Sequence, residues 1–110
     1  MDIIQSSHAF AALSQPTRLK ALRILVQTGK SGMLAGDLGD LMEVRQNTMS
    51  ANLAVLLHAG LVRNEREGRS IRYFADFDGL RDLLSFLMED CCGGKPELCQ
   101  PILDEIACAC

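Results

Sequence analysis

The stretch from residue 34 to residue 74 constrains the fold most, because the spacing of its apolar residues changes from a helical period to a strand period. The segments "LAGDLGDLM" (34–42) and "QNTMSANLAVLLHAG" (46–60) both have helical spacing, and a break at 43–45 separates them. The next segment, "LVRNEREGRSIRYF" (61–74), is typical of two short strands joined by a charged turn. A helix, a tight break, a second helix and a charged hairpin together outline a winged helix-turn-helix.

Further helical segments precede and follow this unit. Apolar spacing predicts helices over residues 3–13 and from Pro16 to a stop at Gly29, and again from Phe77 to a stop at Gly93-Gly94. One further helical turn is expected at Ile102–Ile106. We therefore predict a mainly α fold with a small β-hairpin (α+β). Residues 1–92 would form the DNA-binding and dimerisation domain, and residues 93–110 a cysteine-containing tail.

The distribution of charge along the chain is compatible with an anionic partner for its N-terminal part. Residues 1–75 carry nine Lys and Arg against six Asp and Glu, whereas residues 76–110 carry two against eight, so the total of −3 hides two halves of opposite sign. No apolar run approaches membrane-spanning length, and no signal peptide opens the chain. We therefore expect a cytoplasmic protein without a membrane partner.

The second helix of the pair, residues 46–59, is the expected recognition helix. Amide side chains read adenine in the major groove, hydroxyls reach bases or phosphates, and a helix N-terminus favours phosphate. Arginines in the hairpin would add contacts to the phosphate backbone. A polar helix face and a solvated hairpin are the alternative, but the order of the elements favours double-stranded operator DNA. The expected DNA-binding residues are Gln46, Asn47, Thr48, Ser50, Asn52, Arg66 and Arg69.

All five cysteines fall in the last twenty residues, at positions 91, 92, 99, 108 and 110. An odd number argues against a closed disulfide framework, and clustered thiols in a reducing compartment are more often metal ligands or redox groups. In a helix ending at Gly93-Gly94, Cys91 and Cys92 would diverge by roughly 100° around the axis. The loop "GGKPEL" would bring Cys99 to them. Three thiolates suit a soft, thiophilic ion and suit magnesium or calcium poorly.

Taken together, "SQPTRLKALRIL", "NTMSANLAVLLHAGLV" and "REGRSIRYF" resemble the ArsR family of metal- and metalloid-responsive repressors, over roughly residues 8–90. The resemblance implies a homodimer built from the first and last helices, and repression that ends when an inducer binds. Apolar residues on those two helices support the dimer independently, because they would otherwise leave a patch in water. They are Ile3 and Phe10 on the first helix and Leu80, Leu84 and Leu87 on the last.

The chain departs from the family pattern at its usual sensor sites. Residues 34–42 contain no cysteine, and Asp76, Asp78 and Asp82 near the last helix have no histidine among them. Arg45 stands where relatives commonly have a capping serine. Within the resemblance, a cysteine pair ending the last helix with a third cysteine nearby is similar to sensors of trivalent arsenic. It implies As(III), with Sb(III) as a further candidate, as the inducer at Cys91, Cys92 and Cys99.

Several alternatives stay open from the sequence. The same thiols could sense zinc, cadmium, organoarsenicals or redox state, or the winged domain could bind protein and carry a structural zinc site. Cys108 and Cys110 are either incidental cysteines of a frayed terminus or an accessory pair that captures metalloid or completes a four-cysteine zinc site. No catalytic motif spacing is present, so we expect neither an enzyme nor an organic cofactor.

Overall fold

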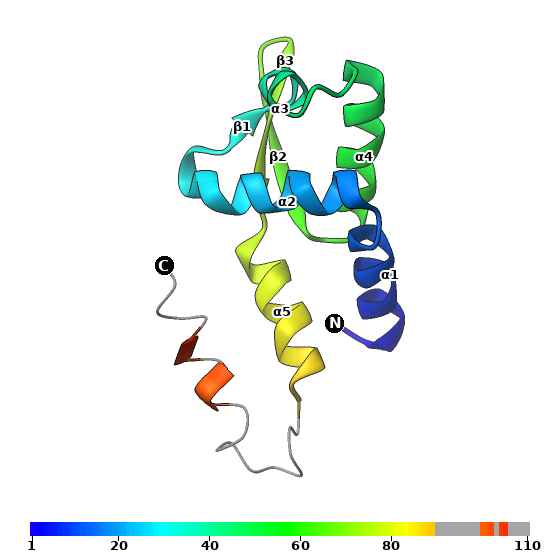
Figure 1. Ribbon diagram of the computed structural model, residues 1–110, viewed down its shortest axis with the longest axis vertical. Helices are drawn as coiled ribbons and strands as arrows, with labels where there is room; N and C mark the ends of the chain where they lie inside the picture. Colours follow the sequence, from blue (N-terminus) through cyan, green and yellow to red (C-terminus); the bar gives the residue numbers. More distant parts are fainter. Residues whose placement is uncertain (90–99, 103, 106–110) are drawn as a thin grey trace.

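The computed structural model describes residues 1–89, 100–102 and 104–105, and it is mainly helical with a small antiparallel sheet (Figure 1). The predicted fold class is therefore confirmed. In chain order the elements are α1 (Ile3–Leu13), α2 (Pro16–Thr28), the 3-10 turn η1 (Gly29–Ser31), β1 (Met33–Leu34), α3 (Ala35–Met42), α4 (Gln46–His58), β2 (Val62–Glu67), β3 (Ser70–Ala75) and α5 (Phe77–Leu87).

The sheet is the predicted hairpin with one short strand added. β2 and β3 pair antiparallel from Val62 opposite Ala75 to Glu67 opposite Ser70, and Gly68 takes a positive φ of 63° in the turn. β1 pairs with the outer side of β3 and gives the order β1-β3-β2. The sequence did not predict β1, because two residues are too few to show a period of two.

The core lies between α2, α4 and the hairpin, with α3 packed on α4 and β3, and α2 crosses the middle of the molecule (Figure 1). Three apolar residues of α4, Met49, Leu53 and Leu56, are fully buried, as their helical spacing predicts. Leu57, the fourth apolar residue of that stripe, is instead 37% exposed. The largest fully buried side chains are Leu25, Leu38, Met49, Leu53, Leu56, Leu61 and Val62.

The break between α3 and α4 is a tight backbone turn. Glu43 ends α3 with a positive φ of 56°, and the Val44 N–H donates to the carbonyl of Gly39 at 2.9 Å. A Cβ on Gly39 would lie 3.1 Å from the Val44 oxygen, so this close approach favours glycine. The turn closes the first helix and fixes where α4 begins.

α5 ends earlier than the sequence predicts. The helix stops at Leu87 with Met88 as its C-cap, and the predicted stop at Gly93-Gly94 is wrong. Glu89 and Asp90 follow directly, and two acidic side chains at a helix C-terminus oppose the helix dipole. The last turn of α5 therefore does not hold Cys91 and Cys92, and all five cysteines lie outside the described residues.

A short helical stretch is present in the described part of the tail, at residues 100–102 and 104–105. There the Gln100 amide Nε2 donates to Oδ1 of Asp104 at 2.7 Å. This agrees with the helical turn expected near Ile102. The predicted boundary between residues 92 and 93 falls outside the described residues.

Candidate nucleic-acid interface

The N-terminal half of α4 presents a polar, solvent-exposed face. Gln46, Asn47, Thr48 and Ser50 are all exposed, as predicted. Arg45 occupies the N-cap position with no capping hydrogen bond from its side chain, and the first turn of α4 contains no acidic residue. The Thr48 N–H donates to Oδ1 of Asn47 at 2.9 Å, and the N–H groups of Gln46 and Asn47, with the positive end of the helix dipole, are available to an anion such as a phosphate.

The sequence predicts that Asn52 lies on the exposed face of α4 with the other DNA-binding residues. The structure instead places it on the buried side of the helix. Its side chain is only 9% exposed, and its Oδ1 accepts a hydrogen bond from Nη1 of Arg18 at 3.4 Å. The position is three residues after Met49 and four before Leu56, so helical spacing alone puts it on the apolar stripe. Arg18 satisfies the amide there, and Asn52 belongs to the packing between α2 and α4.

The β2–β3 hairpin, which we call the wing, engages two of its arginines internally. The Arg63 guanidinium lies over the Phe74 ring at 4.3 Å from the centroid and pairs with Glu65 at 3.4 Å. Arg72 pairs with Glu67 at 2.6 Å and also donates to the backbone oxygen of Ser31 at 3.1 Å. The hydrogen bond to the Glu67 carboxylate raises the pKa of Arg72 above its ordinary value. The contacts with Phe74, Glu65 and Glu67 lie within the wing, and the hydrogen bond from Arg72 to Ser31 joins the wing to the body of the domain.

The two remaining wing arginines are exposed: Arg66 lies near the end of β2, and Arg69 lies in the turn at the tip. Within residues 1–89 and the described part of the tail, neither forms an ion pair with a carboxylate. Of the four arginines in the hairpin, these are the two that the sequence analysis predicts to bind DNA. Their guanidinium groups are the ones that can reach an external anion without breaking a contact of the fold.

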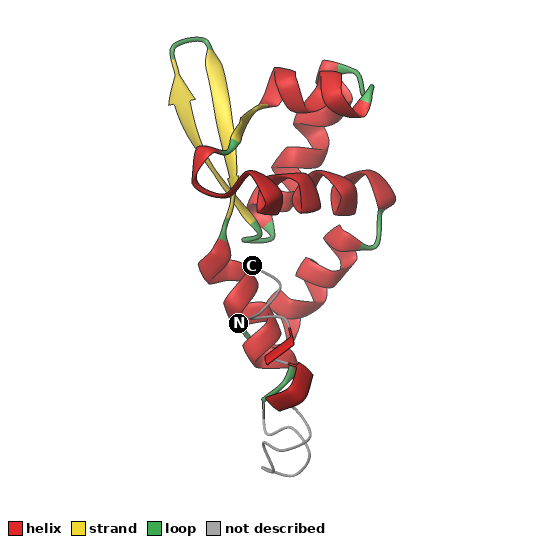
Figure 2. Cartoon of the chain, turned by 60° about the vertical axis from the view of Figure 1, so that its left-hand side comes forward, coloured by secondary structure: helices red, strands yellow, loops and turns green. Residues whose placement is uncertain are grey.

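The wing tip and the N-terminus of α4 lie at the same end of the molecule. Figures 1 and 2 both show them on one side of α2, with α1 and α5 on the opposite side. A polar helix end and a projecting cationic hairpin can contact a duplex together, with the helix in the major groove and the wing on the phosphate backbone.

The comparisons with known proteins agree with this geometry. Residues 13–65 match a family model described as a helix-turn-helix domain. Transcriptional repressor SdpR of Bacillus subtilis is 30% identical over 83 residues, which cover 74% of this chain and 88% of SdpR. An ArsR-like transcriptional regulator from Rhodococcus sp. RHA1 superposes with a TM-score of 0.70 at 28% identity, covering 94% of this chain and 93% of that one.

The chain belongs to the ArsR family of transcriptional regulators.

The solved structure of a protein described as a possible ArsR-family transcriptional regulator carries information on assembly. The homodimeric winged helix-turn-helix DNA-binding domain Mb0332 from Mycobacterium bovis superposes with a TM-score of 0.65 at 25% identity. The match covers 80% of this chain and 82% of that domain. SdpR and the Rhodococcus protein are both described as transcriptional regulators, which agrees with a regulatory role for this family.

The predicted metal ligands are not among the residues that the structure describes. Over residues 1–89, 100–102 and 104–105, no three side chains of His, Cys, Asp or Glu are grouped so that they could hold a metal ion. In this same part of the chain, no helix is both long and apolar enough to span a bilayer. The site at Cys91, Cys92 and Cys99 stays a prediction.

Proposed function

We propose that this ArsR-family protein is a homodimeric repressor that leaves its operator when trivalent arsenic, or antimony, binds Cys91, Cys92 and Cys99. The observation that carries the proposal is the position of the thiols. Every cysteine of the chain comes after α5 in the sequence, beginning with Cys91, and the family's other sensor positions in residues 34–42 contain none. Soft thiolate ligands select soft ions, and trivalent arsenic takes three sulfurs in a pyramid under its lone pair.

Operator binding is assigned to α4 and to the tip of the wing. The exposed amides and hydroxyls of residues 46–50 would read base edges, while the N-terminus of α4 binds phosphate. Arg66 and Arg69 would contact the flanking backbone and give most of the salt dependence. The net positive balance of residues 1–75 supports this division of labour.

Dimerisation is assigned to α1 and α5, which lie on the side of α2 opposite the wing tip (Figures 1 and 2). Ile3 is 70% exposed on α1 and Leu87 is 57% exposed on α5, and α5 buries only Leu83 fully in the isolated chain. Apolar side chains in such number need a partner surface. The other large apolar residues exposed on these two helices are Ile4, Phe10, Phe77 and Leu84.

The coupling between metalloid and DNA would run through α5. A metalloid that fixes the segment directly after α5 changes the end of the dimerisation helix, which sets the separation of the two recognition helices against successive major grooves. By linkage, the factor by which bound metalloid lowers the affinity for DNA equals the factor by which the metalloid binds the DNA-free protein more tightly than the DNA-bound protein.

The identity of the inducer is tested by counting thiols. Purified protein is mixed with arsenite, antimonite, zinc, cadmium, an organoarsenical or peroxide, and the thiols that still react with a chromogenic disulfide are counted. The proposal expects arsenite to protect three thiols per chain and to release DNA at the same stoichiometry. Protection and release by zinc or peroxide alone would assign the thiols to those inducers. Stoichiometric zinc in the purified protein without salt-sensitive DNA binding would identify a protein-interaction domain.

A further inference from the structure

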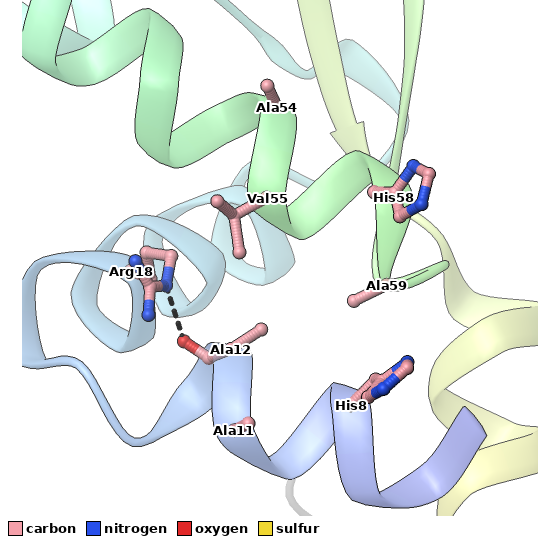
Figure 3. Close-up of a pocket in the computed structure, with 8 residues that line it drawn as sticks. All are labelled: His8, Ala11, Ala12, Arg18, Ala54, Val55, His58 and Ala59. Atoms are coloured by element: carbon pink, nitrogen blue, oxygen red, sulfur yellow. Dashed lines mark hydrogen bonds between the residues drawn. The ribbon is translucent and has the colours of Figure 1, made fainter. Parts of the chain in front are cut away.

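A groove of about 500 Å³ lies between α1 and the second half of α4 (Figure 3). We call it the α1–α4 groove. Its lining comes from α1, from the end of α4 with its C-cap, and from α2, and consists of His8, Ala11, Ala12, Arg18, Ala54, Val55, His58 and Ala59. Its volume falls in the range of small-molecule sites. Its walls are four alanines and Val55, so small side chains leave the space open. The groove is separate from the N-terminal half of α4 that faces the proposed operator.

Arg18 places a cation at one end of the groove. Its guanidinium is half-buried, and Nε donates to the carbonyl of Ala12 at 2.7 Å, as the dashed line in Figure 3 marks. Nη1 reaches Asn52 at 3.4 Å, and no hydrogen bond from Nη2 is formed within the described part of the chain. No Asp or Glu lines the groove, and Arg18 forms no ion pair with any described residue. A partly desolvated cation of this kind is stabilised by an anion beside it.

The opposite end of the groove is less favourable for an anion. His8 and His58 stand there, but both also border a neighbouring polar pocket that Asp76, Asp78 and Asp82 line. These carboxylates lower the electrostatic potential at the histidine end. An anionic group is therefore directed to Arg18, and an apolar body to the alanines and Val55 between the two ends.

We infer that the α1–α4 groove binds a small carboxylate with an apolar body, its carboxylate on Arg18 and its body between α1 and α4. With Nε and Nη1 engaged, Nη2 of Arg18 can donate one charge-assisted hydrogen bond to the carboxylate, and the alanine walls exclude water from the body of the ligand. The site does not depend on the thiols or on operator binding, so it stands or fails separately from the proposed function.

The test uses three probes of similar shape and different charge: benzoate, benzyl alcohol and benzylamine. Each is titrated into ¹⁵N-labelled full-length protein, and the amide shifts of α1 and of the end of α4 are followed. Benzoate is expected to bind about tenfold more tightly than benzyl alcohol, the usual gain from one charge-assisted hydrogen bond, and benzylamine most weakly.

Two variants and one control make the assignment specific. Arg18→Met should remove the preference for benzoate over benzyl alcohol, whereas Arg23→Met, which removes the same charge from an exposed position of α2, should keep it. Ala54→Leu, at an exposed position of α4, fills the groove and should weaken benzoate and benzyl alcohol alike by about tenfold or more. Ala54→Leu also decides the question if Arg18→Met fails to fold, because it leaves the contacts of Arg18 in place.

Three results would overturn the inference. They are equal binding of benzoate and benzylamine, unchanged benzoate binding by Ala54→Leu, and shifts confined to the acidic pocket beside Asp78. If the groove instead receives a second copy of the chain, benzoate would change the amide shifts of neither the wild type nor Ala54→Leu, and Ala54→Leu would sediment as a monomer. That pattern would also contradict a ligand site.

Discussion

Replacing Arg66 and Arg69 with glutamine should reduce the salt dependence of operator binding sharply, because these are the wing arginines without an ion pair among the described residues. Each lost phosphate contact lowers the slope of log K against log salt by about 0.9. Two arginines on each of two wings would therefore lower it by roughly 3.6. At about 0.15 M salt, the same four contacts correspond to roughly a 10³-fold loss of affinity.

The assay is fluorescence anisotropy over a series of salt concentrations, with a duplex selected from a random pool by the wild-type protein. The control variant carries Lys20→Gln and Arg23→Gln, which remove the same charge from the exposed face of α2. The control should keep a slope close to that of the wild type. An unchanged slope in the wing variant, or an equal fall in the α2 control, would refute the assignment of Arg66 and Arg69 to the DNA backbone.

Four further substitutions test the fold, the dimer and the corrected position of Asn52. Gly32→Ala should lower the free energy of unfolding by several kcal/mol, since its Cβ would lie 2.5 Å from the backbone oxygen of Tyr73. Gly29→Ala has the same φ of 59° but open space around it, and should cost only about 1 kcal/mol in chemical denaturation. Leu87→Asp should give a monomer in analytical ultracentrifugation, because it places a charge on the exposed face of α5. Asn52→Ala should lower the melting temperature without altering the selected DNA sequence, because its amide faces Arg18.

Each of these changes has a result that would contradict it. Equal destabilisation by the two glycine variants would mean that backbone conformation, not the contact with Tyr73, dominates at Gly32. The dimer assignment predicts that Leu41→Asp, at a residue 60% exposed on α3, stays dimeric, so a monomer there would show a nonspecific effect. A changed base preference in Asn52→Ala would place this side chain on DNA after all.

The sequence predicts those parts of the fold whose signals are local. The break at 43–45, the start of α4 at Gln46 and the hairpin turn at Gly68 each follow from apolar period and turn residues within a few positions. The exposed polar residues at the start of α4 and at the wing tip are found in the same way, because period alone separates them from the apolar stripe.

The remaining features depend on contacts between residues that are distant in sequence. β1 exists only through its pairing with β3, and Asn52 can be buried only because Arg18, 34 positions away, bonds to its amide. The sequence places the end of α5 too late, because Gly93-Gly94 is an obvious local stop signal, whereas the unfavourable charges of Glu89 and Asp90 have no fixed pattern. The α1–α4 groove has no local signature, since alanines at helical spacing are typical of any closely packed helix pair.

The most direct test of the central proposal is arsenite-dependent release of the selected duplex in a gel shift, with wild type, Cys99→Ser and Cys110→Ser compared. We predict that arsenite releases DNA from the wild type and from Cys110→Ser, and that Cys99→Ser stays bound at the same arsenite concentration while binding DNA normally without it. Undiminished release by Cys99→Ser would contradict the three-cysteine site.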